Sequence, residues 1–216
     1  MIPILKIKRF VDLLVEFIRT DYENAVDKNK SFMYTVLGDH SEDGWNFFNN
    51  AVEIFSRDAS DMRKLETRLM FDRSRAAIPT IHVREPAKNN GGYDSIGFMS
   101  GERVENEDET YSDLYRKTHS SRFELMITSG NSLECILIQE LIESAILSAI
   151  DTLTIPFDIV NISSKELMME SNIEQNMLFI KSVDLEIKYE KTFVPSLYTE
   201  ANIASITFNN PKLLEI

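Results

Sequence analysis

The sequence has few of the residues that stabilise small secreted proteins and few of those that mark disorder. Its 216 residues include one cysteine, seven glycines and six prolines. A lone Cys135 cannot form an intrachain disulfide, which excludes a disulfide-stapled secreted module. Little Gly and Pro, together with 43% hydrophobic residues, excludes a fibrous repeat and a disordered chain. We expect one large domain or one and a half small ones, used in a reducing compartment.

Basic residues are also scarce, since 23 Lys and Arg stand against 35 Asp and Glu, a net charge of −12. This balance argues against a sequence-independent DNA or RNA binder, which needs a basic surface. The excess is uneven, because residues 1–75 carry a net −1, residues 76–130 a net −3 and residues 131–216 a net −8. Acids interrupt the densest basic stretch, Arg57–Arg75, so we interpret it as a solvated, ion-paired helix.

No apolar run is long enough to suggest a targeting or membrane segment, and no membrane partner is expected. The first 20 residues are hydrophobic, but charged residues interrupt them and no small-residue cleavage site follows. Apolar residues recur there at three- and four-residue spacing, which predicts an amphipathic helix. Phe10, Leu13 and Phe17 widen its apolar stripe, so the helix is expected to contact both its own core and something else.

Two further helices and then a strand are predicted up to residue 84. Trp45, Phe48, Val52 and Phe55 share one face of the first helix, and Met62, Leu65 and Leu69 suggest a shorter one. Ile78–Arg84 is typical of a strand, with Pro79 near its start. A connection is expected over Asp27–Lys30 and Gly38–Gly44.

A long loop, residues 85–110, is expected to follow this strand. It holds four of the seven glycines and ends in the acidic run Glu105–Glu109. Its apolar residues Ile96, Phe98 and Met99 would not be needed in an idle solvent loop. An arm that packs on a partner and a disordered spacer both remain open.

The rest of the chain predicts strands around one strong helix. The expected elements are a strand over Tyr111–Thr128, a helix from Leu133 to about Thr152 with Asn131 or Ser132 as N-cap, and strands Ile155–Ile162, Met177–Tyr189 and Ile203–Phe208. A capping-box pattern at Ser163–Glu166 suggests a short helix between the strands. This order predicts an α+β fold, a mainly antiparallel sheet with a long covering helix. We divide it into a helical region, 1–75, and an α+β domain, 76–216.

The sequence contains no recognisable catalytic or metal-binding signature, which argues against an enzyme. There is no phosphate-binding glycine motif, HExxH, GxSxG or CxxC, and the three histidines lack metal-ligand spacing. Cys135 is interpreted as a structural residue rather than a nucleophile. Asp39–Gly44 resembles the start of a calcium-binding EF-hand loop, but Asn50 stands where the bidentate Glu belongs. A turn with Asp43 capping the next helix is the simpler interpretation.

The segment RFELMITSGNSLECILIQELIESAIL, with the order of strands around it, resembles the tail-completion and neck proteins of tailed bacteriophages. The resemblance covers about residues 76–195. The extra helices at residues 31–75 are more similar to the larger ring proteins in the necks of crAss-like phages. The family implies a virion protein, made in the host cytoplasm, that forms a ring of six or twelve copies between portal and tail. It implies no enzyme and no cofactor. DNA would pass through the ring without sequence-specific binding.

A ring subunit needs surfaces for its neighbours, which would be other copies, the portal and adjacent neck or tail proteins. We expect the interface among apolar residues of the long loop, the strong helix and the N-terminal helix: Ile96, Phe98, Met99, Leu133, Leu137, Leu141, Phe10 and Phe17. Two other classes remain open. One is a metal-dependent hydrolase or nuclease-like enzyme, and the other is a monomeric adaptor that binds a peptide at the sheet edge.

Overall fold

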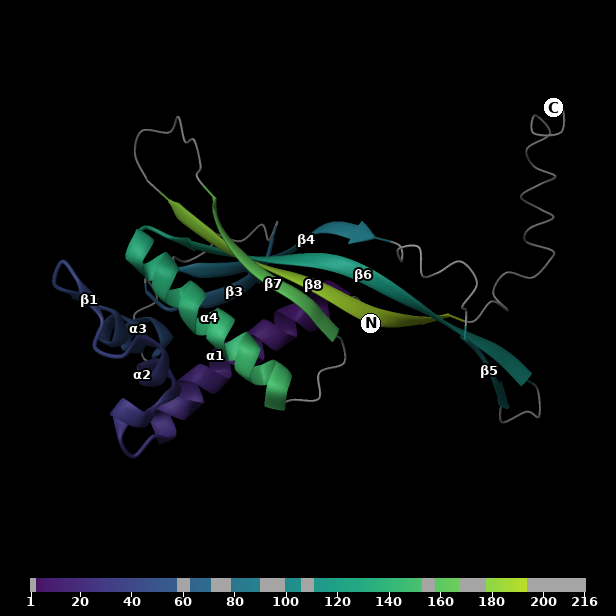
Figure 1. Cartoon of the computed structure of the whole chain (residues 1–216), viewed down its shortest axis with the longest axis horizontal. Coiled ribbons are helices and arrows are strands. Elements are labelled where there is room, and N and C mark those ends of the chain that lie inside the picture. The colour runs from purple at the N-terminus through teal and green to yellow at the C-terminus, as the bar shows by residue number, and fades with distance from the viewer. Residues whose placement is uncertain are drawn as a thin grey trace, which may run out of the picture. The chain divides into compact units, whose positions relative to one another are not determined.

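The computed structural model describes residues 3–57, 63–70, 79–89, 100–105, 111–152, 158–167 and 178–193. It confirms the α+β prediction, since helices pack against a mainly antiparallel sheet (Figure 1). The chain forms two compact units, residues 1–88 with 121–187 and residues 89–120 with 188–216. The first unit contains the N-terminal helices together with the sheet, so this division differs from the expected boundary at residue 75.

The first helix, α1, spans Pro3–Asn24 and confirms the amphipathic prediction. Proline suits the first turn of a helix, where its missing N–H would have no partner. The expected stripe is buried at Ile7, Val11, Leu14 and Ile18, which follow one another at four-, three- and four-residue intervals.

Between α1 and the sheet lie short elements that the sequence only partly predicts. They are η1 (Lys28–Lys30), α2 (Phe32–Leu37), the hairpin β1 (Ser41–Glu42) and β2 (Trp45–Asn46), and α3 (Phe47–Phe55). Arg19 joins α1 to the end of α3, because its Nε donates to the Phe55 carbonyl at 2.9 Å and its Nη2 to the Leu65 carbonyl at 3.1 Å. A guanidinium at the last carbonyls of a helix is a favourable C-terminal partner.

The sheet has the strand order β3-β4-β6-β8-β7. Its strands are β3 (Glu66–Leu69), β4 (Thr80–Asn89), β6 (Tyr111–Ser129), β7 (Asp158–Leu167) and β8 (Phe179–Phe193). β3 and β4 are parallel, with Glu66 opposite Thr80 and Leu69 opposite Val83. Alternate residues of β6, Phe123, Leu125 and Ile127, are fully buried, which confirms the predicted half-buried strand.

The strong helix is α4 (Ser132–Thr152), and it packs across the sheet (Figure 1). The side chain of Asn131 accepts a hydrogen bond from the Leu133 N–H at 2.9 Å, as expected of a residue that begins a helix. α4 also contacts α1, α2 and α3. Its apolar residues are therefore covered on more than one side by the chain itself.

In the second unit, β5 (Ser100–Glu105) pairs antiparallel with the first part of β6, from Ser100 opposite Arg116 to Glu105 opposite Tyr111. The rings of His119 and Tyr189 stack with centroids 5.9 Å apart. Since β4 continues to Asn89 and β5 covers 100–105, the expected loop 85–110 is partly strand.

Three local predictions are wrong. A short helix is expected from Met62, Leu65 and Leu69, but Glu66–Leu69 is the strand β3, which gains its backbone partners from β4; Met62 lies outside the described residues. The short helix at Ser163–Glu166 is part of β7. Asp43 does not cap α3, because Asn46 does so by accepting from the Asn49 N–H at 2.8 Å. The expected strand Ile203–Phe208 lies outside the described residues.

The EF-hand-like segment forms the turn of the β1–β2 hairpin. Ser41 lies opposite Asn46 and Glu42 opposite Trp45, so Asp43 and Gly44 alone make the connection. Both have positive φ, 49° and 78°, which is the backbone of a two-residue Asp-Gly hairpin turn. A tight antiparallel hairpin accounts for these residues without a cation.

Candidate interaction surfaces

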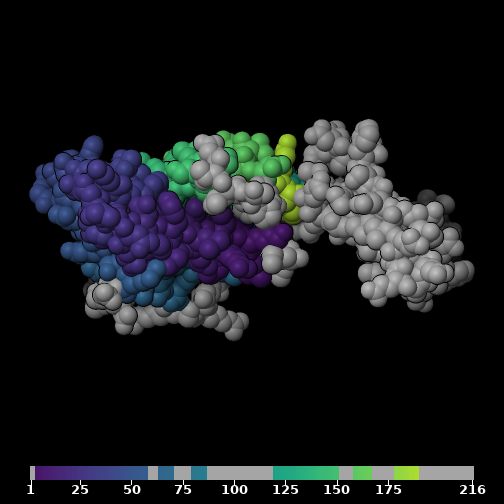
Figure 2. Space-filling view, turned by 90° about the horizontal axis from the view of Figure 1, so that it is seen from below, coloured from purple at the N-terminus to yellow at the C-terminus, as the bar shows by residue number. Residues whose placement is uncertain are grey.

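The face of α1 that points away from the core carries exposed apolar side chains. Leu13 is 59% exposed and Phe17 46%, and Leu5 is exposed as well. The space-filling view shows α1, in purple, at the surface along much of its length (Figure 2). We call Leu5, Leu13 and Phe17 the outer stripe of α1. Two of its members, Leu13 and Phe17, are one helical turn apart and so neighbour each other on the surface.

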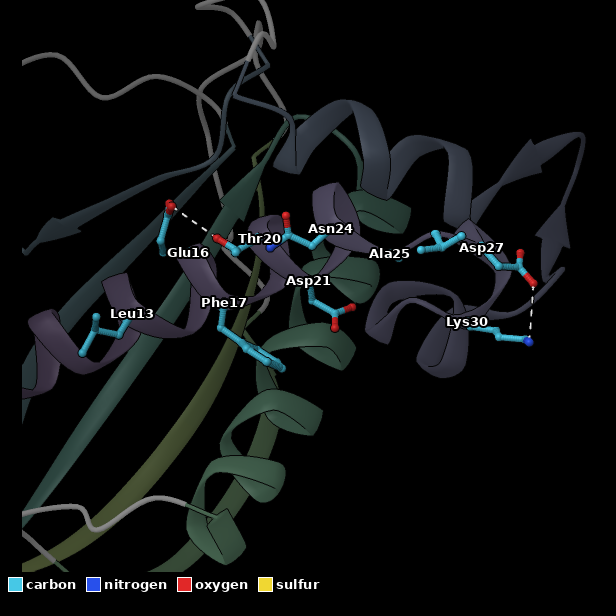
Figure 3. A pocket seen from close by; sticks show the side chains of 10 residues that line it. Leu13, Glu16, Phe17, Thr20, Asp21, Asn24, Ala25, Asp27 and Lys30 are labelled. Carbon is cyan, nitrogen blue, oxygen red and sulfur yellow. Dashed lines mark hydrogen bonds and ion pairs between the residues drawn. The ribbon is translucent and has the colours of Figure 1, made fainter.

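An open groove of about 780 Å³ lies beside Leu13 and Phe17, two members of the outer stripe, and extends past the end of α1 (Figure 3). Leu13, Phe17 and the fully exposed Val26 supply its apolar part. Figure 3 shows Leu13, Phe17 and Asp21 leaving α1 on the same side. The Phe17 ring meets the Phe32 ring edge-on, with centroids 5.5 Å apart. The groove is therefore framed by α1 and the segment that leads to α2.

Charged groups line the same groove, and most are carboxylates: Glu16, Asp21, Asp27 and Lys30. Asp21 accepts a hydrogen bond from the Phe32 N–H at 2.6 Å, and Asp27 accepts one from the Asn29 N–H at 3.1 Å. The Lys30 ammonium lies 4.0 Å from Asp27. Backbone bonds thus hold two carboxylates at the rim of the groove.

The second candidate surface is the strand β7, which ends the strand order of the described sheet. Residues 158–166 are all exposed or half-buried, and Val160 is 50% exposed. Six consecutive residues, Ile159–Ser164, carry no charge. Natural edge strands are usually blocked by lysine, proline or a bulge. An uncharged exposed run at a sheet edge is instead typical of a strand that pairs with another chain.

A row of alternating charges crosses the sheet from β4 to β7. Arg84 contacts Glu124, and Lys165 lies 3.1 Å from Glu124 and 3.3 Å from Asp184, which also contacts Arg122. The Glu124 side chain is only 1% exposed and the Asp184 side chain 5%. We call these five residues the sheet charge row. It joins four neighbouring strands by side-chain contacts.

The cations of this row determine the charge state of Glu124. Burial raises the pKa of the Glu124 carboxyl, but the contacts with Arg84 and Lys165 lower it by more. The pKa of Glu124 therefore lies below its ordinary value. The Arg122 pKa is raised by its hydrogen bond to Asp184. The Glu124 carboxylate is therefore ionised at neutral pH.

Cys135 and His82 are held in uncharged forms. Cys135 is fully buried, with its Sγ 3.3 Å from the Phe179 carbonyl and 3.8 Å from the Ile127 carbonyl. Burial raises its thiol pKa to about 11, so the thiol stays protonated and is a poor nucleophile at neutral pH. Burial, with the nearby Arg68, lowers the pKa of His82. Among the described residues, no three His, Cys, Asp or Glu side chains are grouped to hold a metal ion.

The structure separates the expected interface residues into two kinds. Phe10, Leu137 and Leu141 are buried within the chain. Leu133 is half-buried and Phe17 exposed. The loop residues Ile96, Phe98 and Met99 lie outside the described residues.

Sequence reasoning missed β7 and Val26 as surface features, although both carried a readable signal. The uncharged run Ile159–Ser164 is visible in the sequence, as is the apolar Val26 among polar neighbours. Leu13 widened the predicted stripe of the first helix but was not among the expected interface residues. In the described part of the chain, no helix is both long enough and apolar enough to cross a membrane. Comparison of the sequence with protein-family models and with curated proteins gives no match.

Proposed function

We propose that this chain is a structural, non-catalytic subunit of a homo-oligomer, assembled through the edge strand β7. The observation that carries the proposal is the exposed, uncharged run Ile159–Ser164 at the end of the strand order. A second strand laid against it would satisfy its outward N–H and C=O groups without having to bury a charged side chain.

We further propose that this oligomer is a ring in the neck of a tailed bacteriophage, between portal and tail. The resemblance of residues 76–195 to tail-completion proteins supports the ring. The same resemblance implies six or twelve copies around a DNA channel in the virion. Head-to-tail contacts between unlike edges, such as β7 of one copy and β3 of the next, close into a ring when the rotation allows. A net charge of −12 also suits a wall past which DNA slides without sticking.

The test is the mass of the purified full-length protein, measured by light scattering after size-exclusion chromatography and by native mass spectrometry. We expect a closed oligomer of defined copy number for the natural sequence. Asn161→Lys puts a charge in the uncharged run and should shift the protein toward monomer. Asn49→Lys is the matched control, because Asn49 is exposed on α3, outside the sheet.

Two outcomes would overturn the proposal. One is a natural protein that stays monomeric at high concentration, and the other is an oligomer that Asn161→Lys leaves intact. A monomer that nevertheless binds an added β-strand peptide, and loses it in Asn161→Lys, would support the sheet-edge adaptor instead.

A further inference from the structure

We propose that the groove beside the outer stripe of α1 docks a short amphipathic segment of a different protein, with apolar side chains flanked by lysine or arginine. This surface is separate from β7 and goes beyond self-assembly. The proposal rests on the shape, the exposed apolar groups and the charge of the groove.

The apolar side chains of the groove stay largely exposed in the folded chain, so they contribute little to its core. Leu13 is 59% exposed, Phe17 46% exposed, and Val26 is fully exposed. Single exposed apolar residues are ordinary, but a cluster of them along a groove with a polar rim marks an interaction site. Phe17 is also held in place by the Phe32 ring, so an incoming side chain would meet a pre-positioned aromatic surface.

The rim selects the sign of the partner's charge. Three carboxylates, Glu16, Asp21 and Asp27, stand against one ammonium, Lys30. Glu16 is paired with Arg57 and Asp27 lies 4.0 Å from Lys30, so Asp21 is the rim carboxylate without an ion pair among the described residues. Cations beside the apolar residues of the partner would complement Asp21 and would compete with the exposed Lys30 for Asp27.

A second copy of this chain is poorly suited to an acidic rim, because it carries a net charge of −12 and would be repelled overall. Six of its arginines lie within 4.0 Å of carboxylates of their own chain: Arg19, Arg57, Arg63, Arg68, Arg84 and Arg122. Using them at a docking surface would require breaking those pairs. A different protein with unpaired lysine or arginine carries no such cost.

The length of the groove limits the size of the docked segment. From Leu13 to Asn24 the groove follows α1, a distance of roughly 16 Å at 1.5 Å per residue. This suits about three turns of helix laid along α1, a helix-in-groove arrangement with anchors at three- and four-residue spacing.

The experiment uses two labelled synthetic peptides of about three helical turns. Both have leucines at positions i, i+3 and i+4, one with lysine and the other with glutamate at the remaining sites. Binding to the full-length protein is followed by fluorescence anisotropy. We expect the lysine peptide to bind at least tenfold more tightly than the glutamate peptide. Phe17→Ser and Leu13→Ser should each weaken it about tenfold or more, and Asp27→Asn severalfold.

Controls separate this proposal from folding defects and from self-assembly. Val160→Ser removes an exposed apolar side chain elsewhere and should leave the peptide affinity unchanged. Circular dichroism checks that the Phe17→Ser and Leu13→Ser variants stay folded, as expected for exposed positions. Asn161→Lys, which tests assembly, should still bind the peptide, so failure of one proposal is distinguishable from failure of the other.

Several results would overturn the docking proposal. One is equal binding of the two peptides, and another is unchanged affinity in both Phe17→Ser and Leu13→Ser. Self-association that Phe17→Ser abolishes and Asn161→Lys leaves intact would show that the groove takes a second copy instead.

Discussion

We expect that removing the cations of the sheet charge row reverses the way in which the contribution of Glu124 to folding stability depends on pH. The change is the double substitution Arg84→Met and Lys165→Met, which removes both cations from Glu124. Methionine keeps much of the length and packing of each side chain while removing its charge. Asp184 keeps its contact with Arg122, so the perturbation is concentrated on Glu124.

The expected cost follows from where the three groups lie. The Arg84 and Lys165 side chains are 34% and 40% exposed, whereas that of Glu124 is 1% exposed. Losing one cation should cost about 1.5 to 3 kcal/mol, the range for a hydrogen bond to a charged group, because the second cation remains. Losing both leaves a buried carboxylate without a partner, which costs about 3 to 5 kcal/mol at neutral pH.

The pH dependence distinguishes this mechanism from a simple loss of packing. In the natural protein the pKa of Glu124 is lowered, so its contribution to stability is present above the unfolded pKa and lost as pH falls through the folded pKa. In the double variant burial acts alone and raises the pKa, so Glu124 opposes folding once the pH rises through the unfolded pKa. The difference in unfolding free energy should therefore be largest near pH 7 and shrink on acidification below pH 5.

Urea unfolding followed by circular dichroism, at a series of pH values, measures this difference. Arg57→Met is the control, because Arg57 and its partner Glu16 are both 49% exposed and an exposed pair is worth at most about 1 kcal/mol. A double variant that loses no more than the control refutes the reasoning. So does a difference that stays constant between pH 7 and pH 4.

Three further predictions concern single sites. Cys135, with its thiol pKa raised to about 11, should react with a thiol reagent at pH 8 only after unfolding, and rapid labelling of the native protein would contradict this. The contribution of the protonated thiol to folding stability should be lost as pH rises from about 9 toward 11. Arg19→Met removes two hydrogen bonds to backbone carbonyls and should lower the unfolding free energy by about 2 to 3 kcal/mol, measured in urea. Gly44→Val should cost about 1 to 2 kcal/mol through its positive φ alone, since nothing lies within 4 Å of an added Cβ, while Asp43→Asn should be tolerated.

The sequence predicts those helices and strands in which the apolar pattern repeats often enough to fit a single type of secondary structure. α1 repeats its apolar positions over five turns, and β6 and β8 alternate over many residues. Met62, Leu65 and Leu69 offer only two helical intervals, which are too few to exclude a short strand beginning after Leu65. Pairing with β4 decides the outcome there, and such long-range pairing leaves no local signal.

β7 shows a second way in which a local pattern can mislead. Ser163–Glu166 has the spacing of a capping box, yet the segment is strand and Lys165 belongs to the sheet charge row. The stabilisation comes from Glu124 and Asp184, residues on other strands. A helix start would have taken Lys165 away from both carboxylates.

The apolar belt of α4 could not indicate which molecule covers it. Periodicity shows only that Leu137 and Leu141 need cover, and both a second copy and the remainder of the chain could supply it. The structure places α1, α2 and α3 against α4. The N-terminal helices therefore supply cover for the apolar belt of α4.

The effect of salt concentration distinguishes pairing along β7 from docking on α1. Pairing along Ile159–Ser164 would use backbone hydrogen bonds between uncharged residues, so ionic strength should hardly change it. Docking on α1 depends in part on Asp21 and Asp27 at an open rim, where the Debye length falls from about 10 Å at 0.1 M salt to about 3 Å at 1 M. Peptide affinity should therefore decrease as salt rises, while oligomer mass stays constant. An oligomer that dissociates in salt would mean that the charged residues at the ends of β7, and not its uncharged run, hold the copies together.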